Sequence, residues 1–82
     1  MSRAETFLEQ QTAGWPIRSA EWKAGALAAI GYWFGDVRKI ECPYVFGTAA
    51  ADAWRLGATD GHRIALLAAA NEESAEPVRA PT

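Results

Sequence analysis

Few residue types that could support catalysis occur in this chain of 82 residues, which has one cysteine, Cys42, and one histidine, His62. A cysteine nucleophile needs a base nearby and a third group that orients that base. The sequence shows no such third group, and one cysteine is too few for a disulfide framework or a cysteine-based metal site. We therefore expect no catalytic residue, no metal ligand and no cofactor.

The segment Asp60-Gly61-His62-Arg63 is a second candidate for acid–base chemistry. On a helix, however, Asp60 and Arg63 are three residues apart and form an ordinary surface ion pair. The glycines do not follow either of the common phosphate-binding patterns, Gly-x-x-x-x-Gly-Lys-Ser/Thr and Gly-x-Gly-x-x-Gly. We predict that the protein is not an enzyme.

Aromatic residues suggest binding instead, because four tryptophans are many for so short a chain. We expect Trp22, Trp33 and Trp54 to anchor the core, and Trp15, in a Gly-Trp-Pro turn, to be exposed as in a binding hot spot. An RNA-contacting face of basic and aromatic residues and a solvated surface of mixed charge both remain open. The candidate binding residues are Trp15, Tyr32, Arg38, Lys39, Tyr44, Phe46, Arg55 and Arg63.

The distribution of charge restricts the class of partner. The formal net charge is −2, and the acidic excess lies in residues 71–82, whereas residues 1–70 carry equal numbers of acidic and basic side chains. A neutral body does not attract nucleic acid through its overall field. A local cluster such as Arg38–Lys39 can still contact phosphate.

Hydrophobic periodicity and capping residues predict an all-α fold in a single domain, residues 1–70. A short N-terminal helix is followed by two longer helices packed as a hairpin. Ser2, Ser19 and Thr48 are the expected N-caps, and Gly35 is the expected left-handed residue after the second helix. The predicted helices cover about residues 4–12, 20–34 and 49–70.

Glycines within the long helices indicate close packing. Gly25 and Gly31 each weaken their helix by about 1 kcal/mol relative to alanine, and Gly57, Gly61 and Ala65 form a strip of small residues one turn apart on the third helix. Close approach of another backbone usually compensates for this cost, so we expect the two long helices to pack tightly. The loop 36–47 carries several apolar residues and is expected to be ordered and to lie across the helices. The acidic tail 71–82 is expected to be disordered.

The sequence also indicates a compartment. No basic segment followed by an apolar run opens the chain, so we expect no signal peptide. The longest apolar segment, 24–34, is too short to span a bilayer. We expect a cytoplasmic protein that has no membrane partner.

Three motifs occur in order along residues 22–65. They are Gly31-Tyr32-x-x-Gly35, then Cys42-Pro43-Tyr44, then Trp54-x-x-Gly57-x-x-x-Gly61. In their order and approximate spacing the chain resembles the ribosome modulation factor family. The resemblance implies a pair of helices joined by an aromatic loop, which binds RNA and protein of the small ribosomal subunit and regulates translation. Seven residues would then shape the fold: Gly31, Gly35, Cys42, Pro43, Trp54, Gly57 and Gly61.

Other functions remain open beside this one. The neutral body also fits a phage or mobile-element inhibitor that binds a host protein complex, such as a defence nuclease complex. A third, less favoured alternative is a small enzyme that modifies fluoroquinolone-type drugs, which the same resemblance implies. A core this small also makes a homodimer possible.

Overall fold

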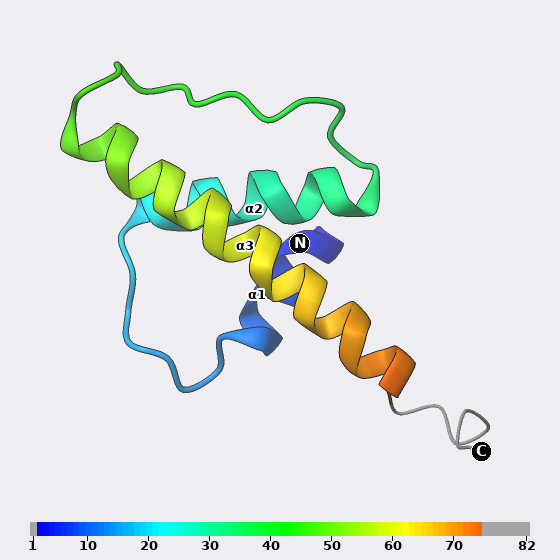
Figure 1. The fold of residues 1–82 in the computed structure, drawn as a ribbon. Helices are drawn as coiled ribbons and strands as arrows, with labels where there is room; N and C mark the ends of the chain where they lie inside the picture. Colours follow the sequence, from blue (N-terminus) through cyan, green and yellow to red (C-terminus); the bar gives the residue numbers. More distant parts are fainter. Residues whose placement is uncertain (1, 75–82) are drawn as a thin grey trace.

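The computed structural model describes residues 2–74, without the side chains of 72–74. It contains three helices, α1 (Arg3–Gln11), α2 (Ala20–Phe34) and α3 (Ala49–Ser74) (Figure 1). No strand occurs in this part of the chain, and the predicted all-α fold is confirmed. α3 extends to Ser74, so the first four residues of the tail predicted to be disordered are helical. The rest of that tail, 75–82, lies outside the described residues.

The predicted caps fix the helix boundaries. The Ser2 hydroxyl accepts the backbone N–H of Glu5 at 3.2 Å, and the Glu5 carboxylate accepts the backbone N–H of Ser2 at 2.9 Å, which completes a capping box. The hydroxyls of Ser19 and Thr48 accept the N–H groups three residues further on at 3.1 and 3.2 Å. Gly35 adopts the left-handed conformation, with φ of 84°, and ends α2.

Glycines allow α2 and α3 to approach closely. A Cβ atom on Gly25 would overlap the carbonyl oxygen of Trp54, and one on Gly57 would overlap the carbonyl oxygen of Trp22. Only glycine therefore fits at these two positions without a shift of backbone. This contact confirms the close approach expected of the long helices, and it explains why two residues that disfavour helices stand inside them.

The contacts also show the relative direction of the two helices. Trp22 lies opposite Gly57, and Ala26, four residues later, lies opposite Gly61, also four residues later. α2 and α3 therefore run in the same direction where they cross, and the segment between them returns along the length of α2 (Figure 1). The expected packed pair is present, but it is not the antiparallel pair that a short hairpin connection would give.

The core lies where α1, α2 and the middle of α3 meet. Trp54 is buried as expected, whereas Trp33 is 42% exposed, so the prediction that it anchors the core is wrong. α3 crosses α2 at an angle and leaves the last turn of α2 partly uncovered (Figure 1). Trp33 only meets the ring of His62 edge-on, with centroids 6.2 Å apart. The main buried cluster consists of Ala4, Leu8, Trp22, Ala26, Ile30 and Ile64.

α1 packs against α2, and its first residues contact the end of that helix. Arg3 donates to both carboxylate oxygens of Asp36, at 2.8 and 3.0 Å, and to the carbonyl oxygen of Phe34 at 2.9 Å. Phe7 meets the ring of Phe34 edge-on at 5.4 Å. The hydrogen bonds from Arg3 hold the pKa of Asp36 below its usual value of 3.8.

The connection between α2 and α3 is only partly packed. Cys42 and Tyr44 are half-buried, and no residue of 36–47 is fully buried. The expectation that this loop lies across the helices is therefore not confirmed. Gly31 was expected to meet another backbone, but its nearest neighbour is the side chain of Val37, whose Cγ2 atom lies 2.9 Å from the position of a Cβ.

Candidate binding surfaces

The end of the long connection presents two large apolar side chains to solvent. Val45 and Phe46 are 76% and 77% exposed. They are held by a turn in which Thr48 donates to the carbonyl oxygen of Val45 through its backbone N–H at 3.3 Å and its hydroxyl at 2.7 Å. Gly47 adopts the positive φ of 89° that this turn requires. Thr48 therefore both caps α3 and holds the turn that carries these side chains.

Arg55 completes this surface from the second turn of α3. Its guanidinium carbon lies 4.8 Å from the centroid of the Phe46 ring, a cation–π contact. We call Val45, Phe46 and Arg55 the loop-tip surface. It combines an exposed aromatic ring with a cation that is already placed against one face of that ring.

Basic side chains also occur in the first part of the connection, before the loop-tip surface. Lys39 pairs with Glu41 at 3.0 Å, and both side chains are more than two-thirds exposed. Arg38 is exposed beside them. Exposed ion pairs of this kind contribute about 0–1 kcal/mol, so a partner that offers a stronger anion can take over the lysine.

The two candidate tyrosines differ in their surroundings. Tyr32 is 52% exposed in the last turn of α2, whereas Tyr44 is half-buried. The thiol of Cys42 donates to the carbonyl oxygen of Tyr44 at 3.7 Å. Pro43 between them is exposed. The chain bends locally at this triplet.

A second surface lies around the linker between α1 and α2. Two adjoining cavities, of about 430 and 390 Å³, share Trp15 and Arg18 as lining residues. We call them the first and second Trp15 cavities. The first opens between α1 and the start of α2. The second opens between the linker and α3, where Arg63 also lines it.

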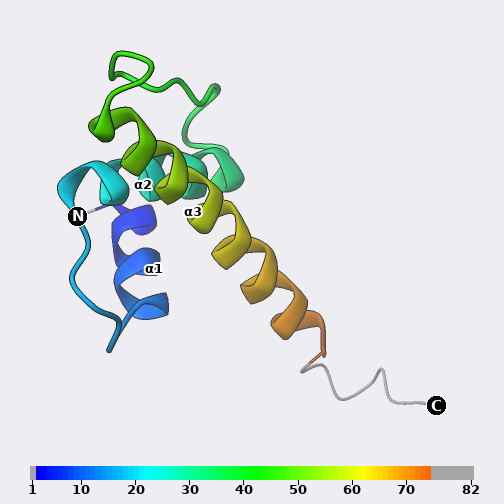
Figure 2. The same ribbon diagram turned by 60° about the vertical axis from the view of Figure 1, so that its left-hand side comes forward.

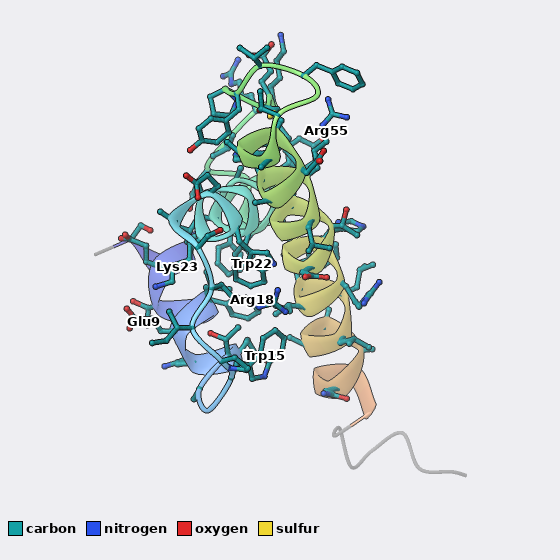
Figure 3. The ribbon with its side chains drawn as sticks, turned by 90° about the vertical axis from the view of Figure 1, so that its left-hand side faces the viewer. Glu9, Trp15, Arg18, Trp22, Lys23 and Arg55 are labelled. Carbon is teal, nitrogen blue, oxygen red and sulfur yellow. The ribbon has the colours of Figure 1, made fainter. Side chains whose placement is uncertain are left out.

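Arg18 and Trp22 connect the linker to both long helices. The guanidinium of Arg18 lies over the Trp22 ring at 5.0 Å (Figure 3). The Trp22 Nε1 in turn donates to the Oδ2 of Asp60 at 3.1 Å. Arg63 approaches the other oxygen of Asp60 only at 4.0 Å. The ion pair expected within Asp60-Gly61-His62-Arg63 is thus long, and Asp60 chiefly serves as the acceptor for the buried indole.

Four of the eight predicted binding residues fall on these two surfaces. Phe46 and Arg55 contact each other, and Trp15 and Arg63 line one cavity. Figure 3 shows Arg55 and Trp15 at opposite ends of the molecule. A single partner that covers both would have to span the length of α3.

Cys42 and His62, the residues with catalytic potential, contact other groups and not each other. Cys42 donates to a backbone carbonyl in the loop, and His62 packs against Trp33. Within the described part of the chain, no group of three histidine, cysteine, aspartate or glutamate side chains is placed to hold a metal ion. None of the helices in residues 2–74 combines the length and apolar character of a membrane-spanning segment.

Sequence reasoning missed three residues of these surfaces. Val45 and Ile17, the latter 95% exposed, were not selected because an isolated aliphatic residue carries no sign of its exposure. Arg18 was not selected, because its position over Trp22 depends on the fold of the linker. A proline next to Ile17 was the only available signal that this segment is extended.

Comparison of the chain with protein-family profiles, with curated proteins and with solved structures found no match. The resemblance of residues 22–65 to ribosome modulation factor thus stays a prediction that depends on the three motifs.

Proposed function

We propose that this protein is a non-catalytic binding protein that covers a functional site on a larger assembly, and that this assembly is the small ribosomal subunit. The observation that carries the proposal is the loop-tip surface, where Phe46 is 77% exposed beside the guanidinium of Arg55. Exposed aromatic residues and arginines supply much of the binding energy at protein interfaces.

The chemistry of this pair also suits RNA. An unpaired base stacks on an aromatic ring or on a guanidinium plane, and an arginine reaches phosphate at the same time. Arg38 and Lys39 lie on the same connection and can add phosphate contacts. The resemblance to ribosome modulation factor, whose loop motif includes Cys42-Pro43-Tyr44, supports the ribosome as the target.

A second candidate function is inhibition of a host protein complex, as expected of a phage or mobile-element protein. The charge of the chain favours it. The formal net charge is −2, and Lys39 is already paired with Glu41. An interface centred on Val45 and Phe46 would be largely apolar and would need no basic field.

Binding to purified small subunits tests the proposal. We expect the protein to co-sediment with them at about 50 mM salt and to lose at least about tenfold in affinity by about 200 mM, because phosphate contacts release counterions. Phe46→Ala should abolish the binding, and Ile17→Ala, which removes an even more exposed apolar side chain in the linker between α1 and α2, should not. No co-sedimentation at low salt would reject the ribosome as target.

A salt-independent interaction would favour the second candidate. An apolar protein interface changes little in affinity over the same range of salt. Binding that persists in Phe46→Ala would reject the loop-tip surface for either partner.

A further inference from the structure

α3 carries a stripe of four residues beside its contact with α2, of which Asp60 bonds to Trp22 of α2 and is 19% exposed while the other three are largely exposed. Leu56 and Leu67 are 51% and 58% exposed, and the Arg63 side chain is 68% exposed. Together with Asp60 these residues lie within about 60° of one another around the helix, at about 100° per residue. The end of α3 extends beyond α1 and α2 (Figure 2). We call Leu56, Asp60, Arg63 and Leu67 the α3 stripe.

The order of residues in the α3 stripe is self-complementary. The spacings are four, three and four, so the stripe has the same spacing in either direction. When a second copy of α3 is turned end over end, Leu56 of one copy meets Leu67 of the other, and Asp60 meets Arg63. A two-fold symmetric interface has this property, since each residue and its counterpart exchange roles across the axis. The alternation of four and three is also the spacing of a helix seam in a coiled coil.

We propose that the α3 stripe is the interface of a homodimer in which two copies of α3 pack antiparallel. Each dimer would contain two Leu56–Leu67 contacts and two Asp60–Arg63 ion pairs between copies. Within one chain Arg63 lies 4.0 Å from Asp60, a long separation that leaves its guanidinium able to turn toward a second copy. The match in charge selects a second copy over an unrelated apolar helix, which would leave Asp60 and Arg63 without counterparts.

The second Trp15 cavity supports the same arrangement. It lies along the stripe and is lined by Asp60, Arg63 and Leu67 together with Trp15. In the antiparallel pair, Leu56 of the second copy meets Leu67 at the edge of this cavity. Burial there would also help a chain of this size, since small domains bury too little apolar surface to be very stable alone.

Molecular mass in solution tests the proposal. At about 100 µM the full chain should have the mass of a dimer in sedimentation equilibrium. Leu56→Glu and Leu67→Glu should each weaken the dimer by at least about a hundredfold, because every substitution occurs twice in a symmetric interface. Ile17→Glu is the matched control at an exposed aliphatic position outside the stripe, and it should remain dimeric. A monomeric wild-type chain would overturn the proposal, as would a dimer that both α3 variants retain.

Cross-linking tests the direction of the two helices. In a Cys42→Ser background, a mixture of Leu56→Cys and Leu67→Cys chains should form a disulfide between the two variants, whereas neither variant alone should cross-link. Cross-linking of each variant with itself would indicate parallel helices and would overturn the antiparallel interface. Circular dichroism checks that the exposed substitutions leave the helices intact.

Discussion

The indole Nε1 of Trp22 donates a hydrogen bond of 3.1 Å to the Oδ2 of Asp60 and so links α2 to α3. Trp22 is 4% exposed, whereas the Asp60 side chain retains 19% of its exposure. A buried indole N–H needs an acceptor, and the carboxylate supplies it from the edge of the core. The bond lies one turn from the contact between Trp22 and Gly57, so it orients the two helices where their backbones approach most closely.

Two substitutions of Asp60 should distinguish the contribution of its hydrogen bond to stability from the contribution of its charge. Asp60→Ala leaves the Trp22 indole without its acceptor and should lower the free energy of unfolding by about 1–3 kcal/mol. Asp60→Asn keeps an amide oxygen that can accept the same bond, and it should lose less than about 1 kcal/mol. Urea denaturation followed by tryptophan fluorescence, at a protein concentration low enough to dissociate any dimer, measures both. Equal losses in the two variants would contradict this role of the bond.

A Cβ atom added where α2 and α3 cross should destabilise the fold, although helix propensity alone would predict a gain in stability. Gly57→Ala gains about 1 kcal/mol from propensity, but the new Cβ overlaps the carbonyl oxygen of Trp22. Backbone cannot rotate away as a side chain can, so α2 and α3 must separate. We expect a net loss of about 1–3 kcal/mol, the usual cost of overpacking, measured as a shift of the urea midpoint.

Gly31→Ala is the matched control, since Gly31 is also a buried glycine within a helix. Its Cβ would meet only Cγ2 of Val37, at 2.9 Å, in a side chain of the connection that can move. We expect a change within about 1 kcal/mol of zero, because the gain in propensity offsets the small displacement. A loss as large as that of Gly57→Ala would show that helix separation is not the cause.

Local rules were sufficient to predict the three helices and their caps. A hydroxyl at Ser2, Ser19 or Thr48 and a glycine at 35 act within a few residues of the chain, so the sequence around each contains all the necessary information. The close contact at Gly25 and Gly57 was also predictable, because glycine inside a helix needs a compensating neighbour.

The direction of α3 relative to α2 could not be predicted in the same way. A stripe of small residues permits either direction, and the choice depends on which carbonyls meet the glycines of the other helix. The exposure of Trp33 also depends on the relative direction of the two helices, because α3 covers Trp33 only if it follows α2 to its last turn. The candidate binding residues were selected by type, and for that reason the separation of Trp15 from Arg55 appeared only with the fold (Figure 3).

The contact between Arg3 and Asp36 should make the docking of α1 sensitive to acid. The pKa of Asp36 lies below its usual value of 3.8, because Arg3 donates hydrogen bonds to the ionised carboxylate. A carboxyl group whose pKa is lower in the folded chain stabilises the fold above its unfolded pKa, and this stability is lost as the pH falls through the folded pKa. We expect α1 to loosen below about pH 4.

Asp36→Asn provides the comparison for that prediction. It should lower the thermal midpoint relative to the wild type at about pH 7, and the difference should shrink as the pH falls below about 4 and the wild-type carboxyl group begins to bind a proton. Thermal unfolding followed by circular dichroism measures both midpoints. A difference that stays constant over this range would assign the effect to something other than ionisation of Asp36.

Charge reversal on the long connection should distinguish the two candidate partners. Arg38 is exposed and lies away from the buried core, so Arg38→Glu should leave the free energy of unfolding within about 0.5 kcal/mol of the wild type. Its affinity for small ribosomal subunits should fall about tenfold or more and become less dependent on salt, since a phosphate contact is lost.

Lys23→Glu makes the same change of charge on α2, beside the first Trp15 cavity (Figure 3), and should leave ribosome binding nearly unchanged. If both variants weaken binding equally, the interaction follows net charge and not a specific contact of Arg38. If neither does, the connection contacts a protein through Val45 and Phe46, and inhibition of a protein complex becomes the better explanation.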